Sequence, residues 1–306
     1  MCSFAYTQIV KSNRWMYFSC RDDSEETIGL LAEMSRSRLV KLYRSKKALA
    51  IPVTYLILFV STLGIIAVTY YYSIQRIDAR SVSLRDSMAE QGMESLDQTA
   101  SSVLWQPGSS KTLQIDDYGG ELVVQPSTNQ LLVNVTDNNG ISNTIFNATV
   151  GQVVYELPYS ESSDAGLFLD GDSSPISNQT GSATAQLYIR NGPEHIEIAL
   201  QYRPIVSVAT YVSEDNTTVY DIRIYVVNLN SSQSIDSMGT VPLEVSCLQN
   251  TVTTYNVTYP TGTLTINANL NGAQGQVSVP ITGGDNSAEV NLNLILCNVK
   301  IENWSR

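Results

Sequence analysis

Apolar and polar positions divide the chain into a helical first third and a β-rich remainder. Residues 49–72, LAIPVTYLILFVSTLGIIAVTYYY, form a run of 24 residues without a charge. At 1.5 Å per residue, a helix of this length reaches roughly 36 Å, more than the hydrocarbon core of about 30 Å. The uncharged run continues through Gln75, and the first charge is Arg76. The pattern predicts a membrane-inserting helix over residues 49–75.

The helical pattern continues beyond this apolar run. Apolar and small residues recur at roughly helical spacing, at Ile74, Ile77, Ser81, Leu84, Met88, Gly92, Leu96, Ala100 and Val103. Gln106-Pro107-Gly108 is a strong stop signal. We therefore predict a helical stalk over residues 76–106 and one continuous helix from about Leu49 to Leu104, roughly 84 Å long. The polar second half has to pack along its own domain or along neighbouring copies.

From Lys111 onward the sequence pattern changes to short runs of β-branched and aromatic residues separated by turn residues. The alternation predicts strands at Thr112–Ile115, Glu121–Gln125, Gln130–Thr136, Gln152–Leu157, Ala185–Ile189, Ile196–Tyr202, Val206–Val212, Val219–Asn228, Leu243–Ser246, Thr253–Tyr259, Thr263–Leu270, Gln276–Pro280 and Glu289–Lys300. No helical pattern lies between them. Residues 107–306 thus read as an all-β, antiparallel β-sandwich region. A seam near residue 203 leaves open whether it forms one lobe or two.

Charge is distributed asymmetrically about the apolar run. Residues 1–48 hold nine Lys or Arg against five Asp or Glu, whereas residues 76–306 hold nine against 24. The positive-inside rule then places the N-terminus in the cytoplasm and the β region outside the cell membrane. The acidic exterior argues against nucleic acid as a partner.

The four cysteines divide in the same way. Cys2 and Cys20 precede the apolar run, and Cys247 and Cys297 follow it. An extracellular location would allow a disulfide between Cys247 and Cys297, closing a loop of about 50 residues. Two buried free thiols are the open alternative. No cysteine or histidine spacing suggests a metal site or a cofactor.

Seven Asn-x-Ser/Thr sequons follow the helix, a mild excess over chance. If the β region is extracellular, each is a candidate N-glycosylation site. They lie at Asn134, Asn147, Asn178, Asn216, Asn230, Asn256 and Asn303.

The sequence contains few residues or motifs that suggest catalysis. The single histidine, His195, stands in a strand, where a surface or hydrogen-bonded role is the expectation. Hydrolase, nucleotide-binding and zinc-protease motifs are missing from the sequence. Acidic pairs occur at Asp116/Asp117, Asp170/Asp172 and Glu194/Glu197, and the second could contribute to Ca²⁺ binding but reads better as a solvated turn. The chain is therefore not expected to be an enzyme.

The stretch MSRSRLVKLYRSKKA followed by LAIPVTYLILFVSTLGIIAVTYYYSIQRI resembles the N-terminus of archaeal type IV pilin-like proteins, archaellins included. The resemblance implies a class III signal peptide with a short basic leader. Lys46, Lys47 and Ala48 would precede the cut, and Leu49 would become the mature N-terminus. It further implies a prepilin-type peptidase as a partner and a filament core of packed apolar helices from copies of this chain or related subunits.

Three features depart from the family pattern. The leader is 48 residues long unless translation begins at Met34. Val53 stands where bacterial pilins carry a glutamate. The β region is larger than most archaellin heads. Pro52 fits a helix that begins near Leu49, because proline is tolerated in the first turn.

Two main functional hypotheses stay open at this stage. The first is a pilin-like structural subunit of an archaeal surface filament or surface complex. The second is a single-pass membrane protein whose residues 1–48 form a cytoplasmic tail and whose exterior β-sandwich binds a ligand, a glycan or a cell-surface partner. Both require the lipid bilayer as a partner, and hydropathy does not separate them. A surface hydrolase has little support among the polar residues.

Overall fold

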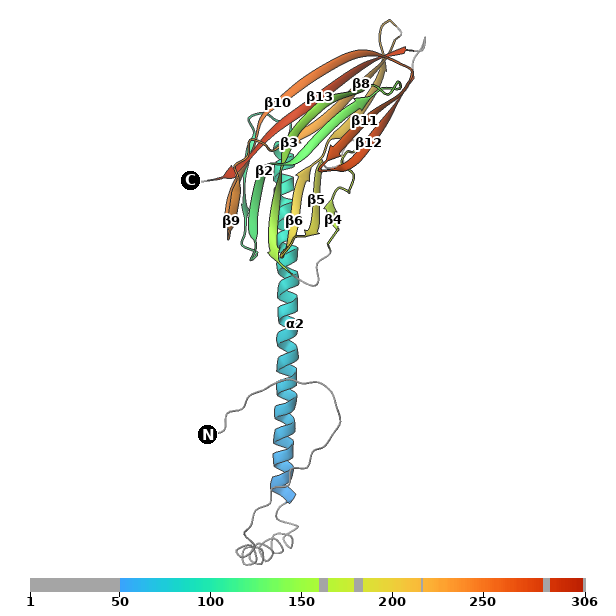
Figure 1. Ribbon diagram of the computed structural model, residues 1–306. Coiled ribbons are helices and arrows are strands. Elements are labelled where there is room, and N and C mark those ends of the chain that lie inside the picture. Colours follow the sequence, from blue (N-terminus) through green and yellow to red (C-terminus); the bar gives the residue numbers. More distant parts are fainter. Residues whose placement is uncertain (1–49, 160–164, 179–183, 216, 283–286, 305–306) are drawn as a thin grey trace, which may run out of the picture. The chain divides into compact units, whose positions relative to one another are not determined.

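A computed structural model describes residues 50–159, 165–178, 184–215, 217–282 and 287–304 (Figure 1). The chain divides into two compact units, Met1–Ile74 and Gln75–Arg306, which are described separately below. The predicted processing residues Lys46, Lys47, Ala48 and Leu49 lie outside the described residues.

One long helix, α2 (Ala50–Val103, 54 residues), runs through both units. It confirms the prediction of a continuous helix, and its end lies one residue before the predicted one. The Leu104 N–H still donates to the Ala100 carbonyl at 3.0 Å, and Trp105 then adopts the left-handed conformation with φ of 66°. A left-handed residue followed by Pro107 cannot continue a helix.

In the second unit α2 buries a regular stripe against the β strands. The buried residues recur at intervals of four and three: Ala89, Met93, Leu96, Ala100 and Val103. The predicted stripe was partly wrong, since Ile77, Leu84 and Met88 are exposed. Successive residues of a helix are separated by about 100°, so Met88 points well away from the face that Ala89 begins.

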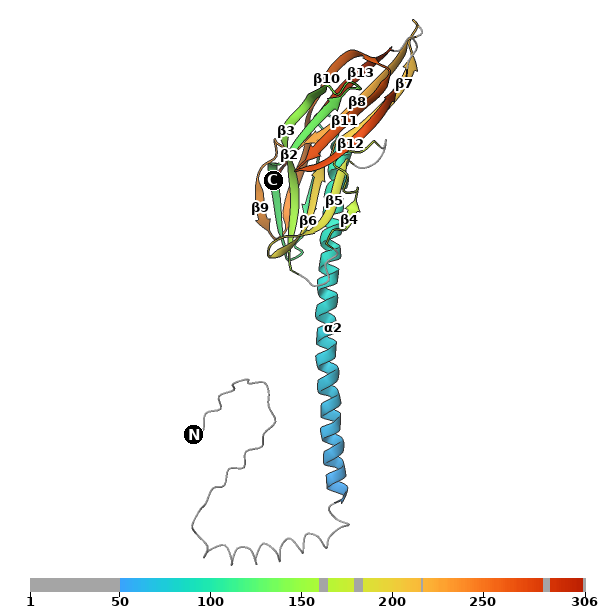
Figure 2. The same ribbon diagram turned by 45° about the vertical axis from the view of Figure 1, so that its right-hand side comes forward.

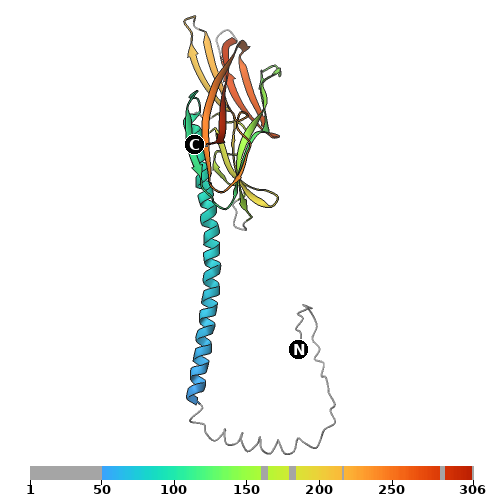
Figure 3. The same cartoon turned by 90° about the vertical axis from the view of Figure 1, so that its left-hand side faces the viewer.

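The remainder is all-β and consists of two curled sheets (Figures 2 and 3). The five-stranded sheet has the order β1-β10-β13-β8-β7. Figure 2 shows β7 at the edge, beside β8. Its strands are β1 (Ser110–Ile115), β7 (Ile205–Val212), β8 (Thr218–Asn228), β10 (Val241–Pro260) and β13 (Ser287–Asn303).

The eight-stranded sheet has the order β12-β11-β2-β3-β6-β5-β4, with β9 also pairing with β2. Its strands are β2 (Glu121–Thr136), β3 (Ser142–Pro158), β4 (Phe168–Asp170), β5 (Ala185–Asn191), β6 (His195–Tyr202), β9 (Ile235–Met238), β11 (Gly262–Leu270) and β12 (Ala273–Ile281). Arg203 and Pro204, the predicted seam, connect this sheet to the other one through β6 and β7.

Strand pairing is antiparallel as predicted, except that β13 runs parallel to β8. After β8 the chain passes through β9, β10, β11 and β12 before β13 returns beside it. A connection of that length is not a hairpin, so it does not require the two strands to be antiparallel.

Several strands are longer than predicted. Two predicted pairs fuse into β2 and β10, each with an irregularity where alternation breaks, between Gln125 and Asn129 and between Cys247 and Gln249. Ser127 in the first irregularity has φ of 63°. A bulge shifts the period-two pattern, which is why each long strand reads as two short ones. The first half of β3 and the short strands β4 and β9 were not predicted.

Two apolar clusters fill the space between the sheets. One includes the stripe of α2 together with residues such as Leu122 and Val299, and the other includes Val133 and Val290. Because β2 and β13 each contribute to both clusters, the long strands link the two into one continuous β domain.

Candidate functional site

A row of charged side chains crosses four neighbouring strands of the eight-stranded sheet. Glu121 of β2 pairs with Glu156 of β3, Glu156 pairs with Glu197 of β6, and Glu197 pairs with Arg190 of β5. Like charges directly opposite each other destabilise a sheet. The row holds three carboxylates and one cation, and that cation lies at its end.

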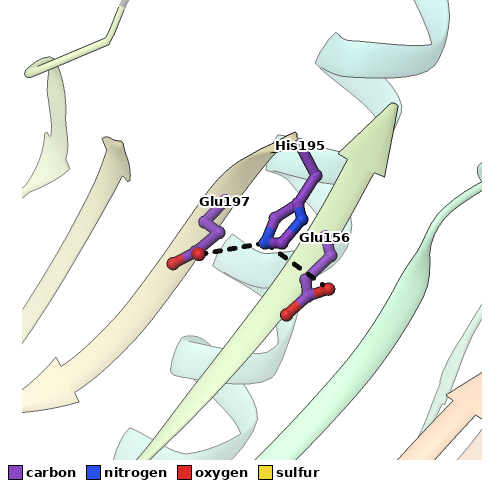
Figure 4. Close-up of side chains that lie close together, drawn as sticks. All are labelled: Glu156, His195 and Glu197. Carbon is purple, nitrogen blue, oxygen red and sulfur yellow. Dashed lines mark hydrogen bonds and ion pairs between the residues drawn. The ribbon is translucent and has the colours of Figure 1, made fainter. Parts of the chain in front are cut away.

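His195 lies between two of these carboxylates (Figure 4). Its Nε2 is 3.0 Å from Oε1 of Glu197 and 3.6 Å from Oε2 of Glu156. The other oxygen of Glu197, Oε2, accepts a hydrogen bond from Nε of Arg190. Glu156, His195 and Glu197 each present one ligand atom, and these three atoms lie within 4.8 Å of one another. We call these three residues the Glu–His–Glu cluster.

Gly192, in the turn between β5 and β6, lies close to the side chains of the cluster. A Cβ on Gly192 would lie 2.7 Å from Oε1 of Glu197 and 2.7 Å from Nε2 of His195. The Gly192 N–H donates to the His195 carbonyl at 2.9 Å, which closes the turn. A larger residue at position 192 would have to displace the ends of these two side chains.

A cleft of about 380 Å³ borders the cluster. Glu156 and His195 line it together with Glu121, the backbone of the turn at Gly119 and Gly120, and Gly239 after β9. Hydrogen bonding with the neighbouring Asp236 raises the pKa of Glu121, and the negative charges of Asp236 and Glu156 add to this effect. The side chains of Glu121, Glu156 and His195 thus lie at one cleft.

The sequence pointed to His195 and to the Glu194/Glu197 pair, but it did not predict that Glu156 and Glu121 lie close to His195 and Glu197. His195 was expected to be a surface or hydrogen-bonded residue, and it is half-buried with two carboxylates beside it. Glu194 is exposed, outside the Glu–His–Glu cluster. The alternation within β3 and β6 fixed which face each residue occupies, but only the pairing register could have revealed the row.

Asp170-Gly171-Asp172, predicted as a solvated turn, contains a carboxylate that is 63% exposed and contacts a buried cation. Asp172 forms an ion pair with the buried Arg203, with 2.5 Å between Nη1 and Oδ1. Arg203 also donates to the carbonyl of Ser174 at 2.8 Å. The turn therefore neutralises a buried guanidinium, and the hydrogen bond with Arg203 lowers the pKa of Asp172.

The first half of α2 is a second feature of functional interest. Its large apolar side chains are exposed in the chain itself, from Ile74 at 40% to Tyr55 at 71%. The helix is long and apolar enough to cross a membrane, with a mean hydropathy of 2.0 in its most apolar window. By length and composition, then, it can serve as a membrane anchor.

The predicted cysteine pair is brought together. Cys247 and Cys297 are both buried, and their Sγ atoms lie 3.4 Å apart as free thiols. Burial raises the pKa of Cys297 to about 12. Their proximity is compatible with either of the two predicted states, a disulfide or a pair of buried thiols.

The sequons differ in accessibility. Asn147, Asn178, Asn230 and Asn303 are exposed, as an acceptor for an oligosaccharide must be. Asn134 is half-buried, and its Oδ1 is buried with no hydrogen-bond partner among the described atoms. Asn216 and the side chain of Asn256 lie outside what the structure describes.

Comparisons of the chain with protein-family models, with curated proteins and with solved structures gave no significant match. Arguments about function consequently rest on the residues and on the geometry given above.

Proposed function

We propose that this chain is a pilin-like, non-enzymatic structural subunit of an archaeal surface filament or surface complex, anchored and assembled through its N-terminal hydrophobic helix. The contrast between the two halves of α2 carries the proposal. Residues of the later half are buried, with Met93 and Leu96 at 0% exposure, whereas Leu58, Phe59 and Ile65 of the first half are all above 60%. Apolar surface of that extent is stable only in a bilayer or against other apolar helices.

The polar atoms of the first half are also suited to an apolar environment. The hydroxyls of Ser61 and Thr62 donate to the Leu58 carbonyl, at 2.9 and 2.7 Å. Thr69 donates to Ile65 at 2.7 Å, and Ser73 donates to Thr69 at 2.7 Å. Hydroxyls bonded within their own helix need no partner from lipid or from a neighbouring helix.

Small residues on the exposed helix support assembly. Ser61, Gly64 and Ala67 recur at intervals of three, and nothing lies within 4 Å of a Cβ built on Gly64. Small side chains permit close approach of helix backbones in membranes and in helical cores. Tyr70, Tyr71 and Tyr72 follow, where amphipathic rings would lie at a membrane interface before release into a filament.

The alternative is a single-pass surface protein whose β domain binds a ligand, and the cleft beside the Glu–His–Glu cluster favours it. In that case residues 1–48 would remain attached and the helix would stay in lipid. The cleft does not exclude the first proposal, because a filament subunit can also bind a ligand.

The decisive experiment is mass spectrometry of the N-terminus of the protein from its native cell, together with shearing of surface filaments. Processing by a prepilin-type peptidase gives a mature start at Leu49 and the chain in lipid-free filaments. The double variant Lys46→Gln/Lys47→Gln should retain its leader, whereas Arg36→Gln/Arg38→Gln, which removes the same charge farther away, should be cut normally. An intact leader on the native protein would refute the pilin-like assignment.

A further inference from the structure

We propose that the Glu–His–Glu cluster is a divalent metal site of the zinc type, with Glu156, His195 and Glu197 as its protein ligands. The inference is independent of the proposed function, because it concerns the β domain and not the helix.

Ligand geometry is the first argument. Zinc binds histidine nitrogen and carboxylate oxygen at about 2.0–2.2 Å, so neighbouring ligand atoms of a tetrahedral site lie roughly 3.3–3.5 Å apart. The distances from Nε2 of His195 to the oxygens of Glu197 and Glu156 are 3.0 and 3.6 Å and bracket that spacing. The ligand oxygens of Glu156 and Glu197 lie within 4.8 Å of each other, so small side-chain movements could place all three ligand atoms around one ion.

Charge is the second argument. Three glutamates lie side by side on β2, β3 and β6, and within the described part of the chain Glu197 is the one that forms an ion pair with an arginine. Glu156 pairs with Glu121 on one side and with Glu197 on the other, so it has a carboxylate beside it on both neighbouring strands. A divalent cation between Glu156 and Glu197 would remove this repulsion.

Orientation is the third argument. Arg190 holds Oε2 of Glu197, which leaves Oε1 directed at His195. Outer groups that fix a ligand in this way are typical of metal sites. Gly192 leaves space for both ligands on the other side.

The ligand set favours zinc over calcium. Calcium takes six to eight oxygen ligands at about 2.3–2.6 Å, usually with several backbone carbonyls, whereas this cluster offers two carboxylates and one imidazole. The cleft that Glu156 and His195 line leaves room for a water or a small anion as a fourth ligand. Three protein ligands with one open position are typical of accessible zinc sites.

The test uses the full, untagged chain in detergent micelles after chelator treatment, with histidine ring nitrogens labelled with ¹⁵N. His195 is the single histidine of the chain, so the ring signals report on this site alone. This matters because the four cysteines could take up zinc elsewhere. We expect Zn²⁺ to shift the Nε2 resonance of His195 in a saturable manner and to raise the unfolding midpoint by roughly 5–10 °C at a hundredfold excess over Kd.

Three variants separate metal binding from an ion-pair role. Glu156→Gln should weaken the Zn²⁺ effect on the His195 ring at least tenfold, while Glu194→Gln, an exposed carboxylate outside the cluster, should leave it unchanged. Co²⁺ should give the strong visible absorption of a four-coordinate ion, which is lost in His195→Asn. A His195 ring that does not respond to Zn²⁺ or Co²⁺, or that responds equally in Glu156→Gln, would overturn the proposal. Saturation by Ca²⁺ in preference to Zn²⁺ would overturn the zinc assignment.

Discussion

The Sγ atoms of Cys247 and Cys297 lie 3.4 Å apart on β10 and β13, although the two residues are 50 positions apart in the chain. Both strands belong to the same sheet, and Cys247 pairs with Val299, which is two residues from Cys297, so the two cysteine side chains lie on the same face of the sheet. Each is buried, so neither has free access to bulk solvent. The pair is thus placed for a bond that would tie the end of the chain to β10.

If the β domain lies outside the cell, as the proposed function implies, we expect Cys247 and Cys297 to form a disulfide in the native protein. Two thiols lose two protons and two electrons to a disulfide-exchange oxidant as the bond forms, and the high pKa of Cys297 makes the uncatalysed step slow. Closing this loop should stabilise the fold by about 3–4 kcal/mol. Peptide mapping without reduction should recover the linked pair, and reductant should lower the denaturant midpoint.

The double variant Cys247→Ala/Cys297→Ala is the control, because its midpoint should not respond to reductant. Full alkylation of both cysteines in unfolded, unreduced native protein would contradict the disulfide and leave the pair as buried thiols.

Asp97 should make the stability of the chain depend on pH. Its carboxyl group is buried in the contact between α2 and the β domain, and burial, with a smaller effect from Asp170, raises its pKa from 3.8 to about 6. A raised folded pKa means that the folded state binds the proton more tightly, so stability falls as pH rises from about 4 to 6. Above pH 6 the loss reaches on the order of 3 kcal/mol.

The variant Asp97→Asn should remove this dependence and be more stable than the parent above pH 6, with the difference vanishing below about pH 4. Glu94→Gln, an exposed carboxylate on the same helix, is the control. Denaturant unfolding of both variants across pH 4–8 provides the measurement. Equal stability of Asp97→Asn and the parent at pH 7 would contradict the burial argument.

Substitutions of the two partners in the ion pair between Arg203 and Asp172 should destabilise the fold by different amounts. The side chain of Arg203 is 2% exposed and that of Asp172 is 63% exposed. Asp172→Ala should cost about 2–3 kcal/mol, somewhat below the usual range for a buried pair, because it leaves a buried charge uncompensated near the surface. Arg203→Met should cost less, since it removes the buried charge itself. A larger loss for Arg203→Met would show that packing, not charge, dominates there.

We also expect Asp172 to cause a fall in folding stability at acid pH. Because its pKa is lowered in the folded state, its contribution is present above its ordinary pKa of 3.8 and is lost as pH falls below that value. Asp172→Asn should lack this fall in an acid titration of stability, and the parent should show it.

A substitution at Gly64 can distinguish assembly of the helices with one another from anchoring in a membrane. Gly64→Leu adds a large side chain to an exposed face of α2, where a Cβ meets nothing within 4 Å in the chain itself. If helices pack together at this point, the variant should insert into membranes but lose at least tenfold in filament yield. Ile66→Leu, a swap of similar volume on the same helix, should assemble normally. Unaltered yield in Gly64→Leu would place the helix contact elsewhere.

The local sequence pattern was sufficient to predict the helix and most strands, but not which strands pair with one another. The continuous helix and its end before Pro107 follow from uncharged length and stop chemistry, which act over a few residues. Most strands followed from alternation between Thr112 and Lys300. The strands β2 and β10 were each predicted as two separate strands, because a bulge interrupts the period that defines a strand.

The sequence by itself determined an apolar helix, a charge asymmetry about it and an all-β remainder, because each depends on residues that are neighbours in the chain. Tertiary structure alone decided that Glu121, Glu156 and Glu197 form one row and that His195 lies against two of them. It likewise decided that Ala89, and not Met88, begins the buried face of α2. Register between distant strands and the docking of a helix are set by the summed packing of many residues, and no single stretch of sequence contains that sum.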